Sequence, residues 1–245
     1  MELYEAYLRH PHISTDSRQA TRGTLFFALR GDSFDGNRYA ASALEAGAAA
    51  AVLDNSEVYE TLTEEQRSRC YLVPDTLEAL QQLAAYHRRQ LGIPIFAITG
   101  SNGKTTTKEL TYRVLSCRFN TYATHGNLNN HIGVPLTLLS MDRSTEFGLV
   151  EMGASHCGEI ALLSSIAQPD FGLITNIGKA HLEGFGGEEG VMRGKGELLD
   201  YLLRHKGTAF YLQQSEALCR MVSERNGLEA IPYSTTDLKL VGNDR

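Results

Sequence analysis

The sequence predicts an α/β protein of two domains, a small one over residues 1–88 and a larger one over residues 89–245. Short apolar runs alternate with amphipathic helical stretches along the chain, which is typical of a mostly parallel sheet covered by helices. The length of 245 residues suits one large domain or two small ones. A glycine-containing loop at residues 100–103 joins a predicted strand to a predicted helix, as in P-loop domains.

In the first domain, three short apolar runs are predicted strands: residues 24–29, 50–53 and 71–73. The residues between 30 and 37 have turn chemistry. A helix is predicted over 39–46, ended by Gly47, and a longer one begins at Pro74 and Asp75. The apolar positions of the longer helix recur three and four residues apart up to Gly92, so we place the domain boundary near residues 85–92.

In the second domain, four apolar runs are predicted strands: residues 93–99, 147–150, 171–175 and 208–212. Three amphipathic stretches between them are predicted helices: residues 104–117, 158–167 and 188–203. The polar loop 127–135 enters an apolar helix or strand, and the segment from residue 231 onward has a strand-like start but no clear final element. In a parallel sheet, ligands bind beyond the carboxyl ends of the strands.

The composition is that of a globular protein, with 42% hydrophobic and 21% charged residues. A net charge of −6 argues against a general nucleic-acid binder but leaves room for a local phosphate site. There is no apolar run of about 20 residues that would span a membrane, and the N-terminus does not resemble a secretory signal. The cysteines are scattered without a CxxC pair, which predicts neither a disulfide framework nor a zinc site. We expect a reduced, cytoplasmic protein.

The strongest motif is the phosphate-binding loop TGSNGKTT. Its candidate nucleotide-binding residues are Gly100, Ser101, Asn102, Gly103, Lys104, Thr105 and Thr106. A tight loop at a helix N-terminus directs backbone N–H groups at phosphate oxygens. Lys104 is predicted to reach the β- and γ-phosphates and Thr105 to bind Mg²⁺. The strict pattern has glycine where this chain has Ile98, so the loop is a variant, and the alternative is an ordinary turn with a surface lysine.

Two further side chains follow predicted strands at the same edge of the sheet. Glu151 follows the strand at 147–150, where an acid can hold the magnesium of a bound nucleotide. Taken alone, it would be a solvated carboxylate. His181 follows the strand at 171–175, although a lone histidine is more often structural.

Lys195 lies between two glycines in a predicted helix. Each glycine costs roughly 1 kcal/mol in a helix, which suggests the close approach of another group, while a solvated lysine remains the default. Asn129 and Asn130 lie in the polar loop at 127–135. Their amides can donate and accept hydrogen bonds, which suits a substrate with phosphates and carbonyls, but asparagines also form turns.

In this order the motifs resemble the Mur ligase family, cytoplasmic enzymes that build the peptide of peptidoglycan. TGSNGKTTTKEL is similar to the family's ATP loop, and GNLNNHIGVPLTLL, EMGASHCGEI, TNIGKAHLEGFG and RGKGELL follow in family order. Residues 14–52 resemble its UDP-binding domain. The resemblance covers essentially the whole chain and is greatest to the branch that joins D-alanyl-D-alanine to UDP-N-acetylmuramoyl tripeptide.

The resemblance implies an ATP-dependent, ADP-forming amide ligase that acts through an acyl phosphate. It places Glu151 and His181 on the family's magnesium ligands and Lys195 on a lysine carried as a carbamate, which binds a second ion. It places Asn129 and Asn130 near the phosphates and the substrate carboxylate. The implied UDP-sugar residues are Ser17, Arg18, Arg30, Gly31, Asp35 and Gly36. The family has a third, C-terminal domain, so we expect this chain to hold the first two domains, the second incomplete.

Other readings remain open at this point. The nearest alternative is another enzyme of the superfamily, either an earlier Mur ligase or folylpolyglutamate synthase, and the front motifs favour a UDP-sugar substrate over folate. A second alternative is a non-catalytic fragment that binds the UDP-linked substrate without turnover because the third domain is not supplied. A P-loop switch protein would need a guanine-reading NKxD motif, which the sequence lacks. We expect small-molecule partners, no nucleic acid, no membrane span and a monomer.

Overall fold

The structure, a computed structural model, describes residues 2–31, 33–178 and 182–237. The chain divides into two compact units. The first holds Met1–Leu91 together with Pro135–Asp142, and the second holds Gly92–Val134 and Arg143–Arg245. The sequence pattern did not indicate that residues 135–142 belong with the first unit.

Four parallel strands form the sheet of the first unit. In order across the sheet they are β1 (His12–Ser14), β2 (Thr24–Phe27), β5 (Ala50–Leu53) and β6 (Cys70–Leu72). Every residue of β2 and β5 is buried, which explains why both are continuous apolar runs rather than alternating ones. Among the described residues, β1 is the strand that the sequence analysis missed in this sheet, because HIS is short and only partly buried.

Helices and a small hairpin complete the first unit. The helices are α1 (Glu2–Arg9), α2 (Ala40–Glu45), α3 (Ser56–Thr61), α4 (Glu64–Arg67) and α5 (Thr76–Leu91). The predicted helix at 39–46 begins instead with a 3₁₀ turn at Gly36–Tyr39. The predicted turn at 30–37 contains two antiparallel strands, β3 (Arg30–Gly31) and β4 (Phe34–Asp35). Helices α3 and α4 are too short to show a helical period.

Buried polar side chains hold the segment Pro135–Asp142 to the first unit. The Tyr7 hydroxyl donates to the backbone oxygen of Leu139 at 2.7 Å. His87 Nε2 lies 2.8 Å from the backbone oxygen of Met141, and it donates this bond because a carbonyl oxygen only accepts. Burial lowers the pKa of His87 below its ordinary value, although the Met141 bond and the charge of Asp142 oppose the shift. The imidazole is therefore held neutral.

This histidine predicts an acid sensitivity of the fold. The pKa of His87 is lower in the folded chain than the ordinary value of about 6.5, so the unfolded chain binds its proton more readily. The contribution of neutral His87 to the free energy of unfolding is therefore fully present above about pH 6.5. It is lost as the pH falls from there through the pKa of the folded state. We expect the Tm to fall on acidification and His87→Gln to flatten this dependence, measured by thermal unfolding followed by circular dichroism. An unchanged slope in the variant would contradict the assignment.

Six parallel strands form the sheet of the second unit. In order they are β12 (Glu229–Tyr233), β11 (Thr208–Leu212), β10 (Phe171–Ile174), β7 (Ile95–Thr99), β9 (Phe147–Glu151) and β8 (Thr121–Ala123). The predicted mostly parallel α/β fold is confirmed. Strand β8 and helix α11 (Glu216–Ser223) were not predicted as elements, and the strand-like start predicted at residue 231 falls within β12.

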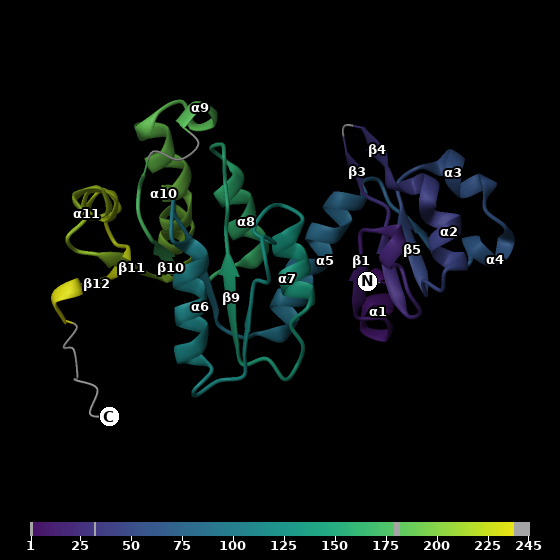
Figure 1. Cartoon of the computed structure of the whole chain (residues 1–245), viewed down its shortest axis with the longest axis horizontal. Coiled ribbons are helices and arrows are strands. Elements are labelled where there is room, and N and C mark those ends of the chain that lie inside the picture. Colours follow the sequence, from purple (N-terminus) through teal and green to yellow (C-terminus); the bar gives the residue numbers. More distant parts are fainter. Residues whose placement is uncertain (1, 32, 179–181, 238–245) are drawn as a thin grey trace, which may run out of the picture. The chain divides into compact units, whose positions relative to one another are not determined.

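Helices pack along this sheet. Figure 1 shows α6, α8 and α10 beside β9 and β10, and α6 and α8 also contact β7. The helices not yet given are α6 (Lys104–Leu115), α7 (Gly133–Leu139), α8 (Glu159–Ala167), α9 (Leu182–Phe185) and α10 (Glu188–His205). Helix α7 runs from the second unit into the segment that belongs to the first. Within the described part of the chain, no helix combines the length and apolar character needed to cross a membrane.

Candidate functional site

The loop between β7 and α6 has a backbone that requires glycine at both ends. Gly100 has φ 141°, and a Cβ there would lie 2.0 Å from Thr175 Oγ1. Gly103 has φ 74° and precedes the first residue of α6. Both backbone conformations are in the left-handed region that favours glycine. The first N–H groups of α6 have no partner within the helix, so the loop presents donors where an anion can bind.

Residues after β10 brace this loop. Ser101 Oγ accepts from the backbone N–H of Gly178 at 2.9 Å. The Asn102 N–H donates to Asn176 Oδ1 at 3.1 Å, and the Asn102 carbonyl accepts from Thr175 Oγ1 at 2.6 Å and from Asn176 Nδ2 at 3.0 Å. These hydrogen bonds hold the loop to the segment that follows β10.

Lys104 is the first residue of α6, and its ammonium turns back over the loop. Nζ donates to the carbonyl of Gly100 at 2.9 Å and to that of Ser101 at 3.4 Å. Thr105 and Thr106 follow on the first turn of the helix and are exposed. The three residues thus occupy the first turn of α6.

Glu151 ends the strand next to this loop and is buried, with 2% of its surface exposed. Glu151 pairs with Ile98 in the register of β9 and β7. It therefore lies one residue before the end of β7, at Thr99. Oε1 accepts from Asn129 Nδ2 at 2.9 Å. Oε2 is buried and has no hydrogen-bond partner among the described residues. A buried carboxylate oxygen without a partner is unfavourable unless a cation or donor completes it.

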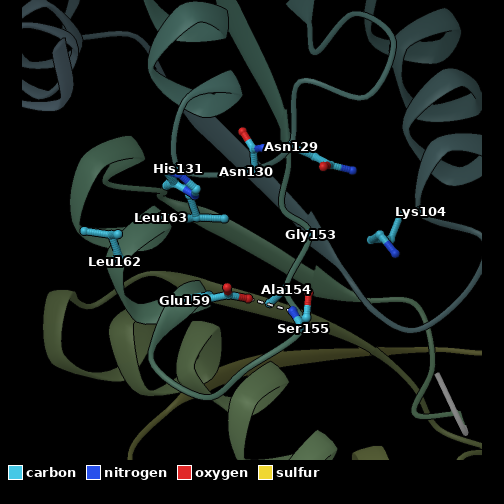
Figure 2. Close-up of a pocket in the computed structure, with 10 residues that line it drawn as sticks. All are labelled: Lys104, Asn129, Asn130, His131, Gly153, Ala154, Ser155, Glu159, Leu162 and Leu163. Atoms are coloured by element: carbon cyan, nitrogen blue, oxygen red, sulfur yellow. Dashed lines mark hydrogen bonds between the residues drawn. The ribbon is translucent and has the colours of Figure 1, made fainter. Parts of the chain in front are cut away.

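A cavity of about 540 Å³ lies beside the loop. Its lining residues are Lys104, Asn129, Asn130, His131, Gly153, Ala154, Ser155, Glu159, Leu162 and Leu163. In the view of Figure 2, Lys104 lies on one side and His131 and Leu163 on the other. The cavity thus brings the predicted Lys104, Asn129 and Asn130 into one space.

The two asparagines have different local roles in the cavity wall. The side chain of Asn129 donates to Glu151, as described, and its backbone carbonyl accepts from the Gly153 N–H at 2.7 Å. Asn130 Oδ1 accepts from the N–H groups of Ile132 at 3.1 Å and Gly133 at 2.8 Å. It therefore caps the N-terminus of α7, and the same side chain borders the cavity.

Two carboxylates hold the opposite wall, the loop from Gly153 to Gly158. Glu159 Oε2 accepts from the N–H groups of Ser155 at 2.6 Å and His156 at 3.0 Å, and Figure 2 marks the first of these bonds. Glu197, from α10, accepts from the N–H groups of Gly158 and Ala161. These bonds fix the wall. Burial acts to raise the pKa of Glu159, but the hydrogen bonds from Ser155 and His156 outweigh it and lower that pKa below its ordinary value.

Lys195 is buried on α10, with 2% of its surface exposed. Its Nζ donates to the carbonyl of Ala154, in the cavity wall, at 3.1 Å and lies 5.2 Å from the centre of the Phe185 ring. Burial lowers the pKa of Lys195 to about 8, and the positive charge of Lys104 acts in the same direction, while Glu159 and Glu197 oppose it. A substantial neutral fraction near neutral pH is unusual for a lysine.

The glycines beside Lys195 are explained by packing. A Cβ at Gly194 would lie 2.3 Å from Phe185 Cε1, and one at Gly196 would lie 2.6 Å from Arg225 Nη2. The close approach that the sequence predicted is therefore with Phe185 and Arg225. This packing fixes the rotation of α10 and directs Lys195 toward the cavity wall.

In the first unit, the predicted Arg30, Asp35 and Gly36 lie in a polar network. Arg30 Nε is 2.7 Å from Asp54 Oδ1, and Asp35 Oδ1 accepts from the N–H of Asn37 at 3.0 Å. Burial acts to raise the pKa of Asp54, but hydrogen bonds and the charge of Arg30 outweigh it and hold that pKa below its ordinary value. A Cβ at Gly36 would lie 2.5 Å from the Leu29 oxygen, so glycine is required there.

The other predicted residues of the first unit are more open. Ser17 and Arg18 begin the 3₁₀ turn after β1, and Arg18 pairs with Asp16 at 2.8 Å. A Cβ on Gly31 would meet nothing within 4 Å. The loops that hold Ser17 and Gly31 follow β1 and β2, at the carboxyl edge of the sheet.

One predicted residue cannot be placed, since His181 lies outside the described residues. The sequence analysis missed His131, Ser155 and Glu159 as lining residues of the cavity. The signal was present, because Gly153, Ala154 and Ser155 come two to four residues after Glu151 at the carboxyl end of β9, and His131 directly follows Asn130. Among the described residues, no group of three or more His, Cys, Asp or Glu side chains is placed to hold a metal.

Comparison with known proteins identifies both units. The Mur ligase middle domain matches residues 98–243, and the profile described as Mur ligase family, catalytic domain, matches residues 11–88. Two curated relatives named UDP-N-acetylmuramoyl-tripeptide–D-alanyl-D-alanine ligase are similar to the chain. The protein from Bacillus subtilis is 42% identical over 85% of this chain and 44% of its own length. The one from Synechocystis is 47% identical over 78% of this chain and 41% of its own length.

A solved structure agrees with these matches. The MurF ligase from Thermotoga maritima, in complex with ADP, superposes with a TM-score of 0.81 at 31% identity, over 93% of this chain and 51% of that one. The chain thus spans less than half the length of the two curated relatives. With one family profile over most of the second unit and another over most of the first, the chain belongs to the Mur ligase family.

Proposed function

We propose that this protein joins D-alanyl-D-alanine to UDP-N-acetylmuramoyl tripeptide with ATP, in peptidoglycan precursor synthesis. The observation that carries the proposal is the similarity to ligases of that name across both units, 42% identity over 85% of this chain. We propose that it acts in the cytoplasm, where ATP and UDP-linked precursors occur, and as a monomer.

The nucleotide belongs at the loop that precedes α6. Backbone N–H groups at the loop and helix N-terminus offer hydrogen bonds to phosphate oxygens, and the helix dipole adds positive potential. Lys104 would leave the carbonyls of Gly100 and Ser101 and take a phosphate oxygen instead. The ordered loop keeps the reorganisation on binding small.

The residues present fit a magnesium ion. The unpartnered Oε2 of Glu151 is an anionic oxygen ligand, and the exposed hydroxyl of Thr105 is a second. Magnesium is usually bound by one or two carboxylates together with substrate phosphates and water, so a small protein ligand set suffices. When bound, the ion offsets negative charge on the phosphates. We propose His181 and Lys195 as ligands of a second ion.

The role proposed for Lys195 requires a change of charge. An ammonium would repel a metal ion, but the nitrogen of the neutral amine can bond to the carbon of CO₂ and release one proton to solvent, which leaves a carbamate anion. The burial that lowers the pKa of Lys195 to about 8 increases the fraction of neutral amine available for this addition. The carbamate would give up the donation from Nζ to the Ala154 carbonyl or keep it through its N–H.

The first unit would bind the UDP end of the substrate, with Ser17, Arg18, Arg30, Gly31, Asp35 and Gly36 as its candidate residues. Their loops lie at or near the carboxyl edge of the β1–β2–β5–β6 sheet, where ligands of parallel sheets bind. Asn129 and Asn130 would contact the tripeptide carboxylate or the phosphates from the cavity wall.

The proposed reaction has two steps, formation of an acyl phosphate and then formation of the amide bond. An oxygen of the tripeptide carboxylate bonds to the γ-phosphorus, the bond to the bridging oxygen breaks, and ADP leaves. The amine of D-alanyl-D-alanine then bonds to the acyl carbon, phosphate leaves, and the amine loses a proton. The chain's residues position the groups and neutralise charge, since phosphoryl transfer needs no protein nucleophile.

Mass spectrometry of the reaction products tests the proposal. The complete gene product is incubated with ATP, Mg²⁺, UDP-N-acetylmuramoyl tripeptide and D-alanyl-D-alanine. We expect the UDP-linked pentapeptide and one ADP for each peptide bond. A UDP-dipeptide or UDP-monopeptide accepted in place of the tripeptide would assign the protein to another ligase of the family.

A further inference from the structure

Lys108 is a buried lysine that the proposed reaction does not use. It lies on α6, one turn after Lys104, and only 1% of its surface is exposed. Burial of an ammonium is strongly unfavourable unless polar groups surround it. Among the described residues, Lys108 Nζ donates a hydrogen bond to the backbone carbonyl of Thr124 and forms an ion pair with Glu109 Oε1 at 3.1 Å. Since Glu109 is itself half-exposed, the buried contact is the one with Thr124.

Thr124 links this lysine to Glu151. The residue follows β8 and is 1% exposed. Its Oγ1 accepts from the backbone N–H of Glu151 at 3.0 Å, and its own N–H donates to the Leu149 carbonyl at 3.0 Å. Thr124 therefore holds the last residues of β9, and Lys108 holds Thr124 to the helix that carries Lys104 and Thr105.

This connection bears on the side chain of Glu151, at the end of β9 beside β7. Glu151 Oε1 is fixed by Asn129, and Oε2 has no partner among the described residues. A metal ion shared between Glu151 and Thr105 needs both oxygens at a set separation, and magnesium tolerates little departure from octahedral geometry. Residues that orient metal ligands therefore affect metal affinity without touching the metal.

We propose that Lys108 is a positioning residue for magnesium, fixing Glu151 relative to α6 through Thr124. The inference rests on the proposed function, in which Glu151 and Thr105 hold the ion. Lys108 would act on the magnesium-dependent part of nucleotide binding and leave the contacts of the phosphate-binding loop alone. A lysine that only stabilises the fold would affect both parts equally or neither.

Calorimetric titration of this chain with AMP-PNP, with and without Mg²⁺, separates the two roles. The measured quantity is the ratio of the Kd without magnesium to the Kd with it. We expect Lys108→Met, which keeps the length but loses the donor, to reduce this ratio about 10-fold. Thr124→Val removes the hydroxyl that holds Glu151 while keeping the carbonyl, and we expect the same loss. The Kd without magnesium should stay within about twofold of the parent in both.

Glu109→Gln is the matched control, because it changes the other partner of Lys108 and has no link to Glu151. Its ratio should equal that of the parent. If Lys108→Met does not fold, Lys108→Gln takes its place, because its shorter side chain stays polar but withdraws the donor from the Thr124 carbonyl, while Thr124→Val tests the link from Thr124 to Glu151. An unchanged ratio in a folded variant, or an equal loss with and without magnesium, would overturn the positioning role. If the parent chain instead binds AMP-PNP with the same Kd with and without magnesium, the proposed magnesium site itself is wrong.

Discussion

Lys104→Ala is expected to lower the turnover of the complete gene product by about 100- to 1,000-fold, the usual effect of removing one preorganised donor from a developing negative charge. The ammonium lies at the N-terminus of α6 and lines the cavity beside the phosphate-binding loop. Its recorded hydrogen bonds are to carbonyls of its own loop, so its loss should leave the fold intact. ADP release under saturating substrates measures the effect.

Arg113→Ala is a suitable control for this variant. Arg113 is an exposed cation in the last turn of the same helix. The substitution therefore removes the same charge from α6, but at the end of the helix away from the loop. Turnover in the control should match the parent. Near-normal turnover of Lys104→Ala, with an unchanged circular dichroism spectrum, would be incompatible with a role for Lys104 at the phosphates.

The strand–loop–helix conformation at residues 95–115 could be predicted from the sequence because its determinants are local. Gly100 and Gly103 adopt left-handed backbone conformations, and the strand and helix on either side have clear periodicity. The same holds for Glu151, whose place at the carboxyl end of a strand follows from the apolar run before it. Local patterns of this kind survive in the fold because packing agrees with them.

The contribution of residues 135–142 to the first unit could not be predicted in this way. It depends on buried contacts of Tyr7 and His87 with backbone oxygens more than 50 residues away in sequence. A fragment cut near residue 88 would leave both side chains without those partners. The predicted boundary near residues 85–92 is close to the first change of unit, at Leu91 and Gly92, but does not describe the return of the chain.

Lys108 and the glycines beside Lys195 show the same limit at single residues. The pattern of α6 gives no sign that Lys108 is buried, because a lysine at a helix surface is ordinarily solvated. The glycines did indicate close approach, but the groups that approach, Phe185 and Arg225, come from other segments. Such tertiary contacts cannot be read from spacing alone.

Lys195→Ala is expected to abolish most activity of the complete gene product, and short carboxylic acids in the medium are expected to restore part of it. A lysine with an ordinary pKa is an ammonium at neutral pH and would repel magnesium. Lys195 is buried, has a lowered pKa and borders the cavity wall through Ala154, so conversion to a carbamate would put an anion at that wall. Removal of the side chain leaves a space that acetate or formate can occupy. ADP release as a function of added acid measures the rescue.

Two further variants separate the carbamate from other roles of this lysine. Lys195→Arg keeps a positive charge but cannot form a carbamate, so it should be inactive if the carbamate is required and active if a cation is required. Arg193→Ala, an exposed cation two residues earlier on α10, should behave as the parent. Parental activity of Lys195→Ala would refute the carbamate. An inactive Lys195→Ala that no small acid restores, beside an active Lys195→Arg, would assign a direct role to the ammonium, acting on the Ala154 carbonyl and the wall that it holds.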